Sequence, residues 1–195
     1  DAVVLALGGS PVVPDIPGVD KPIVVSNQAL HKSLKRYLRF LSPRALRYLT
    51  KFWMPLGKRV IIIGGSIQGC ELAEFLVKRG RNVTLVDTGK ISGEGMPEER
   101  SARLLAWFAK KGVHLISEVS LEQITDDGLI IIRKDGSTEM LKADNIILAL
   151  PFKPDTGLQE ELEGKFPEVY SIGDCKEPRL ILDAINEGSH VANAL

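Results

Sequence analysis

The most regular pattern of hydrophobic and polar positions in the chain lies between Lys58 and Asp87. Val60–Ile63 is a short β-branched run between basic residues and glycines, which is typical of a buried strand in a parallel sheet. An amphipathic segment with Leu72 and Phe75 on one face follows, and a second β-branched run ends at Asp87. The pattern therefore predicts a strand, a glycine turn, a helix and a second strand, the arrangement of a dinucleotide-binding βαβ unit.

The predicted turn has the sequence Gly64-Gly65-Ser66-Ile67-Gln68-Gly69. Gly64 allows the chain to turn sharply out of the strand, and Gly69 allows the helix to pack close to the sheet. Backbone N–H groups of this segment would lie at the helix N-terminus, where the partial positive charge favours a pyrophosphate. Ser66 stands at the middle glycine position, so the backbone can approach the phosphates slightly less closely. We expect all six residues to bind a nucleotide.

Asp87 is predicted at the end of the second strand, where a carboxylate can accept hydrogen bonds from both ribose hydroxyls of an adenosine. Its charge would repel a 2′-phosphate, which favours NADH over NADPH. This preference is weakened by three basic residues that are near in sequence, Arg79, Arg81 and Lys90. A similar turn also occurs in α/β proteins that bind nothing, but two flanking strands and a terminal acid favour the nucleotide site.

Hydrophobic runs on both sides of this unit predict further strands. The segment Asp1–Leu7 resembles Asp144–Leu150, and a proline follows each of them, which indicates two related α/β modules, one interrupted by the other. Short strands separated by Asp126-Asp127-Gly128 and Asp135-Gly136 predict a β-meander before the run at Ile146–Leu150.

A third pattern lies near the end of the sequence. Val169–Ile172 predicts a strand that ends at Gly173-Asp174, and a helix is expected to begin near Leu180, with Leu182 and Ile185 on its apolar side. A carboxylate at a strand end, beside a helix N-terminus, suits a ligand that carries hydroxyls and phosphates. Gly-Asp is also a common turn, so the structural interpretation stays open.

Composition excludes several classes of protein. Lys and Arg number 25 and Asp and Glu number 25, so the whole chain has no electrostatic preference for nucleic acid or membrane. Cys70 and Cys175 are far apart, which argues against a disulfide scaffold and a local dithiol centre, and the histidines lack metal-ligand spacing. No signal peptide or membrane-spanning run is present, so a cytoplasmic location is expected. The chain begins inside a strand pattern without a methionine, and we expect a piece of a longer protein.

The segment 27–56 differs from the rest of the chain. Leu30, Leu34 and Leu38 have helical spacing, and seven Lys or Arg residues accumulate in the segment without any acidic residue. Such a segment can bind nucleic acid or a membrane surface. We favour packing against another part of the intact protein, because the apolar stripe requires a protein surface and the basic face can stay solvated.

Together these residues resemble the C-terminal part of a pyridine-nucleotide flavoprotein oxidoreductase of the glutathione-reductase structural class. The resemblance covers essentially the whole chain. It is greatest to the old yellow enzyme relatives that include 2,4-dienoyl-CoA reductase, 2-enoate reductase and trimethylamine dehydrogenase, through the segments 69–74 and 178–185.

The resemblance implies an α/β fold in which a Rossmann-like NAD(P)-binding domain is inserted into a partial FAD-binding domain. The division that it implies is an FAD-domain segment at 1–26, a basic helical connector at 27–56, an NAD(P)-binding domain at 57–150 and a C-terminal FAD-domain segment at 151–195. It also implies individual roles: Glu71 lies near the nicotinamide, and Gly8, Gly173 and Asp174 serve FAD. A plain helix-surface charge is the alternative for Glu71.

The function implied by the resemblance is hydride transfer from NADH to FAD, and onward to FMN and an enoate or dienoyl-type substrate. Hydride transfer requires positioning and no acid–base residue, so no catalytic side chain is assigned. FMN, an iron–sulfur cluster, the catalytic barrel and the first FAD half are expected in a missing N-terminal part, and that part or a neighbouring subunit is the expected protein partner. The family pattern is not kept at Leu7, Leu150 and Pro151. An alternative function therefore stays open: a non-catalytic module that holds an adenine nucleotide as a structural element.

The basic segment gives a first prediction. The 195-residue chain should show no binding to labelled duplex or single-stranded oligonucleotides at physiological salt, as measured by fluorescence anisotropy. Weak binding that disappears between low and physiological salt agrees with a solvated basic face, because phosphate contacts are strongly salt-dependent. Micromolar affinity that survives physiological salt would show that the segment is a nucleic-acid site.

Overall fold

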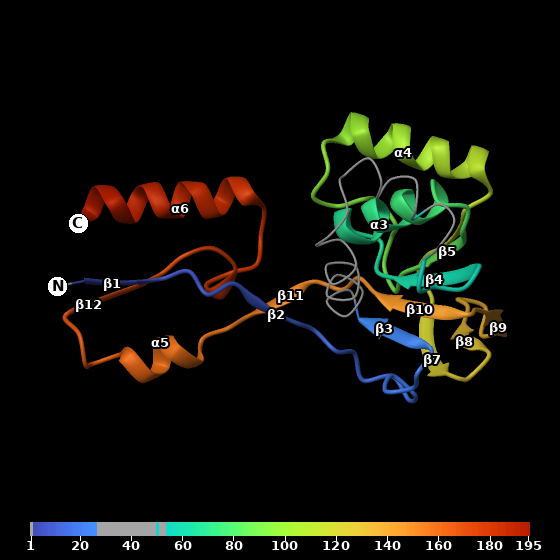
Figure 1. Cartoon of the computed structure of the whole chain (residues 1–195), viewed down its shortest axis with the longest axis horizontal. Coiled ribbons are helices and arrows are strands. Elements are labelled where there is room, and N and C mark those ends of the chain that lie inside the picture. Colours follow the sequence, from blue (N-terminus) through green and yellow to red (C-terminus); the bar gives the residue numbers. More distant parts are fainter. Residues whose placement is uncertain (1, 27–49, 51–53) are drawn as a thin grey trace. The chain divides into compact units, whose positions relative to one another are not determined.

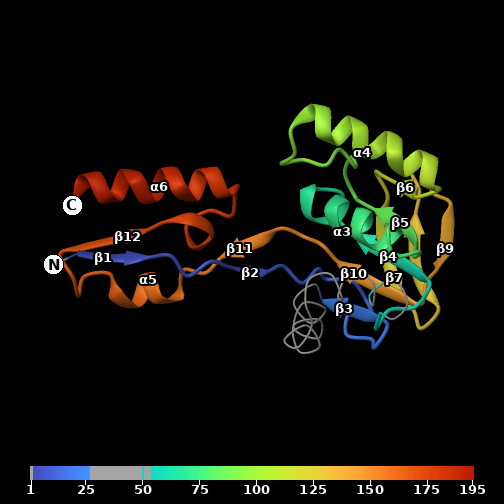
Figure 2. The same ribbon diagram turned by 45° about the horizontal axis from the view of Figure 1, so that its top comes forward.

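The computed structural model describes residues 2–26, 50 and 54–195, which Figures 1 and 2 show in two views. The basic helical connector expected at 27–56 lies outside the described residues except for Thr50 and residues 54–56, so its helices stay a prediction. Contacts divide the chain into two compact units. The larger is Val13–Leu150, and the smaller joins Asp1–Val12 to Pro151–Leu195.

A five-stranded parallel sheet forms the centre of the larger unit, in the order β3, β10, β4, β5, β6. In chain order its strands are β3 (Val24–Ser26), β4 (Arg59–Ile63), β5 (Asn82–Val86), β6 (His114–Ile116) and β10 (Asn145–Leu148). The helix α3 (Ile67–Val77) makes the crossover from β4 to β5, and α4 (Glu98–Lys111) makes the crossover from β5 to β6. The structure confirms the predicted βαβ unit, since parallel neighbours need such a crossover.

Both faces of this sheet are buried, which explains the unbroken apolar run in β4. Alternate residues of a strand point to opposite faces, so Val60 and Ile62 share one core with α3 and α4, while Ile61 and Ile63 share another. The second core is completed by a three-stranded antiparallel sheet made of β7 (Ser120–Ile124), β8 (Gly128–Ile132) and β9 (Thr138–Lys142). Its consecutive strand order confirms the predicted β-meander (Figure 1).

The smaller unit contains two strand pairs. The parallel pair is β1 (Ala2–Leu5) with β12 (Glu168–Ser171), and the antiparallel pair is β2 (Gly9–Pro11) with β11 (Phe152–Pro154). Its helices are α5 (Gly157–Leu162), the 3₁₀ turn η1 (Gly173–Cys175) and α6 (Ile181–Ala194). Because β1 and β12 run in parallel, the turns that follow them leave the same edge of the pair.

Two features go beyond the sequence expectations. The strand β3, which the sequence patterns did not predict, pairs with β10 inside the larger unit, and the division between the compact units falls after Val12. On α6, Leu182 and Ile185 belong to the predicted apolar side of the helix, but they are 66% and 62% exposed. The strongest contacts of α6 among the described residues are with η1, and they leave its apolar side open. The assignment of the segments to FAD and NAD(P) binding stays a prediction.

None of the described helices has the length and hydropathy needed to span a membrane.

Candidate functional site

The turn between β4 and α3 contains two glycines at which a side chain would collide with backbone atoms. Gly64 has φ +121°, and a Cβ there would lie 2.3 Å from the carbonyl oxygen of Ala149 on the neighbouring strand connection. At Gly69, a Cβ would lie only 1.8 Å from the carbonyl oxygen of Gly64. Both obstacles are backbone atoms, which cannot swing aside. The close approach therefore fixes where α3 begins relative to the sheet, as expected of this kind of turn.

The amide groups of the turn divide into two sets. Gly65 N–H donates to Asp87 Oδ2 at 2.5 Å, and Ile67 N–H donates to the Glu94 carbonyl at 2.8 Å. Apart from these, the N–H groups of Ser66, Gln68 and Gly69 form no hydrogen bond with another described residue. Unpaired N–H groups at the start of a helix, together with the helix dipole, make an anion site.

Asp87 lies directly after β5, half-buried, and bridges two glycine segments. Its second oxygen, Oδ1, accepts the N–H of Gly89 at 2.7 Å. An ionised carboxylate has about four lone-pair sites, so two backbone donors leave room for the hydroxyls of a ribose. The sequence predicted Asp87 as a ribose acceptor. The structure adds that the same carboxylate holds the turn through Gly65.

A loop after β5 forms one side of this site. Gly93 N–H donates to the Gly65 carbonyl at 3.0 Å, while the Glu94 carbonyl accepts from Ile67 as described above. The loop is itself tied to α4, because the Ser101 hydroxyl donates to the Ser92 carbonyl. These acceptors are main-chain carbonyls, which any residue carries, so no sequence signal identifies them.

Glu71 projects from α3, just after its first turn, and pairs with Arg100 of α4, with Oε1 and Nη2 2.7 Å apart. Both side chains are about half exposed, so the pair remains accessible to a ligand. Its place near a nicotinamide stays a prediction. Cys70, next to it, is buried and donates to the Gly65 carbonyl at 3.5 Å. Burial, reinforced by the charge of Asp87, raises the pKa of the Cys70 thiol to about 11, so it is a packed residue and not a nucleophile.

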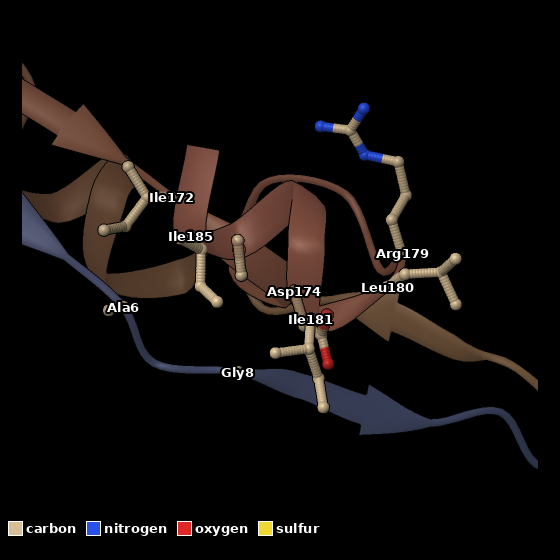
Figure 3. A pocket seen from close by; sticks show the side chains of 10 residues that line it. Ala6, Gly8, Ile172, Asp174, Arg179, Leu180, Ile181 and Ile185 are labelled. Atoms are coloured by element: carbon tan, nitrogen blue, oxygen red, sulfur yellow. The ribbon is translucent and has the colours of Figure 1, made fainter. Parts of the chain in front are cut away.

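A second candidate site lies in the smaller unit, where a cavity of about 460 Å³ opens beside α6 (Figure 3). Three residues that the resemblance assigned to FAD, namely Gly8, Gly173 and Asp174, line this cavity although they come from opposite ends of the sequence. Both glycines have positive φ, +81° and +66°. Three isoleucines, at positions 172, 181 and 185, form its apolar wall. The cavity therefore combines an apolar surface with a few polar groups, as small-molecule sites do.

The Gly173 turn is held by residues that the sequence analysis missed. Glu187 of α6 accepts the Gly173 N–H at 2.7 Å and pairs with Arg179, while the Cys175 thiol donates to the carbonyl of Leu5 at 3.2 Å. The Gly173 N–H lowers the pKa of Glu187, and the charges of Lys176 and Arg179 lower it further. A glutamate 14 residues after the glycine has no recognisable spacing, so only the fold reveals the contact.

A family model for pyridine nucleotide-disulphide oxidoreductases matches residues 1–188. The chain belongs to this family. It is similar to the nitric oxide reductase FlRd-NAD(+) reductase of Klebsiella pneumoniae, with 29% identity over 194 residues that cover 91% of the chain and 47% of the relative. The corresponding protein of Escherichia coli strain SE11 is 29% identical over 195 residues. The chain thus spans about half the length of these curated relatives.

Solved structures agree with the family. A 2-naphthoyl-CoA reductase complex has a TM-score of 0.78 and 28% identity, and the match covers 96% of the chain and 26% of that protein. The water-forming NADH oxidase of Lactobacillus brevis has a TM-score of 0.66 with 23% identity over 99% of the chain and 46% of its own, which supports the fold alone. The predicted α/β fold of an FAD- and NAD(P)-binding oxidoreductase is confirmed. Among the described residues, no cluster of His, Cys, Asp and Glu could hold a metal ion.

The Gly69 packing gives a direct test of the first site. We expect Gly69→Ala to destabilise the larger unit by about 3 kcal/mol, the upper range for overpacking, because its Cβ would meet a backbone carbonyl. It should also weaken nucleotide binding by at least about tenfold, by shifting the helix N-terminus. Urea unfolding and calorimetric titration measure the two effects.

Ser66→Ala is the matched control in the same turn. The Ser66 side chain makes no capping hydrogen bond, so its removal should change stability by less than about 0.5 kcal/mol. Equal stability of the two variants would contradict the close approach of α3 to Gly64.

Proposed function

We propose that the chain is the nucleotide-binding part of an NADH-dependent flavin oxidoreductase. The observation that carries the proposal is a set of N–H groups at Ser66, Gln68 and Gly69 that have no hydrogen-bond partner among the described residues and lie beside Asp87 in the larger unit. Membership of the pyridine nucleotide-disulphide oxidoreductase family supports the use of FAD and a nicotinamide nucleotide.

The larger unit fits a nicotinamide nucleotide. Its free N–H groups would hold the pyrophosphate, and Gly64 and Gly69 keep the turn clear of side chains that would block it. Asp87 would accept from the adenosine ribose with the lone pairs that Gly65 and Gly89 leave free. Its negative charge disfavours a 2′-phosphate, which supports NADH as the preferred nucleotide. Glu71 is proposed to lie near the nicotinamide.

The cavity of the smaller unit fits part of a flavin. At about 460 Å³, its volume lies within the usual range for small-molecule sites. Asp174 would accept from the ribityl hydroxyls, and the glycines at positions 8 and 173 keep the backbone open to the ligand. When bound, the flavin accepts a hydride from the nicotinamide and passes electrons to a further acceptor. The chain's own residues bind and orient the two ligands, so no side chain has to donate or remove a proton.

The proposed electron acceptor is supported by one similar structure and by the sequence resemblance. Similarity to a protein named 2-naphthoyl-CoA reductase, at 28% identity, supports an unsaturated acyl-CoA or enoate substrate of the old yellow enzyme type. FMN and an iron–sulfur cluster would then belong to parts of the protein outside these residues, which would also form the partner surface. Their place in the proposal rests on the resemblance described above.

Anaerobic titration of the full-length gene product with NADH tests this function. We expect the visible absorption of bound flavin to fall as NADH is added, with about one equivalent of NADH needed for each flavin, because one hydride carries the two electrons that reduce one flavin. The Gly69→Ala variant should need more NADH for the same bleaching. Flavin that stays oxidised while calorimetry shows bound NADH would support the alternative, a structural nucleotide module without turnover.

Nucleotide preference is a separate prediction. The 195-residue chain should bind NADH more tightly than NADPH, and Asp87→Ser should relax the preference by about 1–3 kcal/mol, the scale of a charged hydrogen bond. Calorimetric titration with both nucleotides measures the difference. Glu94→Gln is the control, because this exposed acid touches the turn only through its main-chain carbonyl. Tighter binding of NADPH by the unmodified chain would refute the role given to Asp87.

A further inference from the structure

Glu187 is the least exposed acid of a charge cluster beside the cavity of the smaller unit. Its side chain is only 12% exposed, and it contacts three groups: the Gly173 N–H at 2.7 Å, the Arg179 guanidinium, and the Lys176 ammonium at 3.8 Å. A carboxylate removed from water to this extent needs charged or hydrogen-bonding partners, and this one has both. Glu187 therefore has one defined position on α6.

Two of these contacts reach residues that line the cavity. Gly173 adopts a left-handed conformation with φ +66°, and the bond from its N–H to Glu187 holds this turn in place. Asp174 follows directly, so the orientation of its carboxylate depends on the same turn. Arg179 lines the cavity as well (Figure 3). Glu187 is one of its acidic partners.

The hydrogen bond also restricts what the turn can offer to a ligand. The Gly173 N–H already donates a hydrogen bond to Glu187, so it cannot donate to a phosphate or a carbonyl group of a cofactor. Among the side chains that line the cavity, those of Asp174 and Arg179 carry the charges. Glu187 pairs directly with Arg179, and it holds the Gly173 turn that carries Asp174.

We propose that Glu187 is a positioning residue for the flavin, which fixes the Gly173–Asp174 turn and Arg179 before the cofactor enters the cavity. The inference rests on the proposed function, because it assigns the cavity to FAD. A group that is ordered on folding does not have to be ordered on binding, so such preorganisation increases affinity without a direct contact.

Glu187→Gln in the full-length gene product tests the proposal. The isosteric amide removes one of the three carboxylates that pair with Arg179, the others being those of Glu177 and Asp183, and it weakens the bond to Gly173. We expect the Kd of the apoprotein for FAD to rise about tenfold, the scale of one charge-assisted hydrogen bond. The peptide that contains Gly173 should exchange its amide hydrogens faster, and the visible circular dichroism of the bound flavin should change. The KM for NADH should stay the same, because the nucleotide turn is in the other unit.

Glu177→Gln is the matched control. The Glu177 side chain also pairs with Arg179, at 3.3 Å, but it is 64% exposed. Glu177 contacts the Gly173 turn through its main-chain N–H, which donates to the Gly173 carbonyl at 3.0 Å and which the glutamine variant keeps. Loss of the Glu177 charge should leave FAD affinity and amide exchange unchanged. Wild-type FAD affinity in Glu187→Gln, or an equal loss in Glu177→Gln, would overturn the proposal.

If the glutamine variant does not fold, the Glu187→Asp variant tests whether Glu187 positions the flavin site. Aspartate keeps the charge but withdraws the carboxylate by one methylene, so FAD affinity should again fall, and wild-type affinity would overturn the proposal. Failure of the proposed function gives a different result: the wild-type protein itself would bind no FAD. Amide exchange at Gly173 in the unliganded protein would then still show whether Glu187 holds the turn.

Discussion

The close packing of Gly69 against the carbonyl of Gly64 is the constraint on which the nucleotide unit depends. With 1.8 Å between that oxygen and any added Cβ, α3 can begin at only one place relative to β4. In this position the N–H groups of Ser66, Gln68 and Gly69 have no partner in the part of the chain that the structure describes, while the neighbouring N–H groups of Gly65 and Ile67 donate to Asp87 and Glu94. A helix that began even one residue later would present a different set of donors to a phosphate.

Both candidate sites contain a glycine turn that is held by a carboxylate. In each, a glycine turn follows a strand, and a carboxylate from a different element accepts the glycine N–H: Asp87 for Gly65 at 2.5 Å, and Glu187 for Gly173 at 2.7 Å. A charged acceptor makes a shorter and stronger hydrogen bond than a neutral one, so the turn is held firmly while its other polar groups face a ligand. The remaining difference is that Asp87 is itself proposed to bind the ligand, whereas Glu187 acts through its neighbours.

Local patterns explain how much of this could be predicted from sequence. The βαβ unit, the meander and the glycine turn were predicted because their signals lie within about thirty consecutive residues and follow from chain geometry. The contacts from Glu94 and Glu187 were not, since one uses a main-chain carbonyl and the other joins residues on separate elements. Helical periodicity predicted an apolar side on α6 correctly, but it cannot state whether that side is covered, and Leu182 is 66% exposed.

Titration of the ¹⁵N-labelled 195-residue chain with NADH, followed through its amide resonances, tests the nucleotide site most directly. The free N–H groups of Ser66, Gln68 and Gly69 should show the largest shifts, because a pyrophosphate bound there would accept hydrogen bonds from them. Amides of α6 should stay unchanged. Shifts that spare these three amides, or that concentrate in the smaller unit, would contradict the assignment of the nucleotide site.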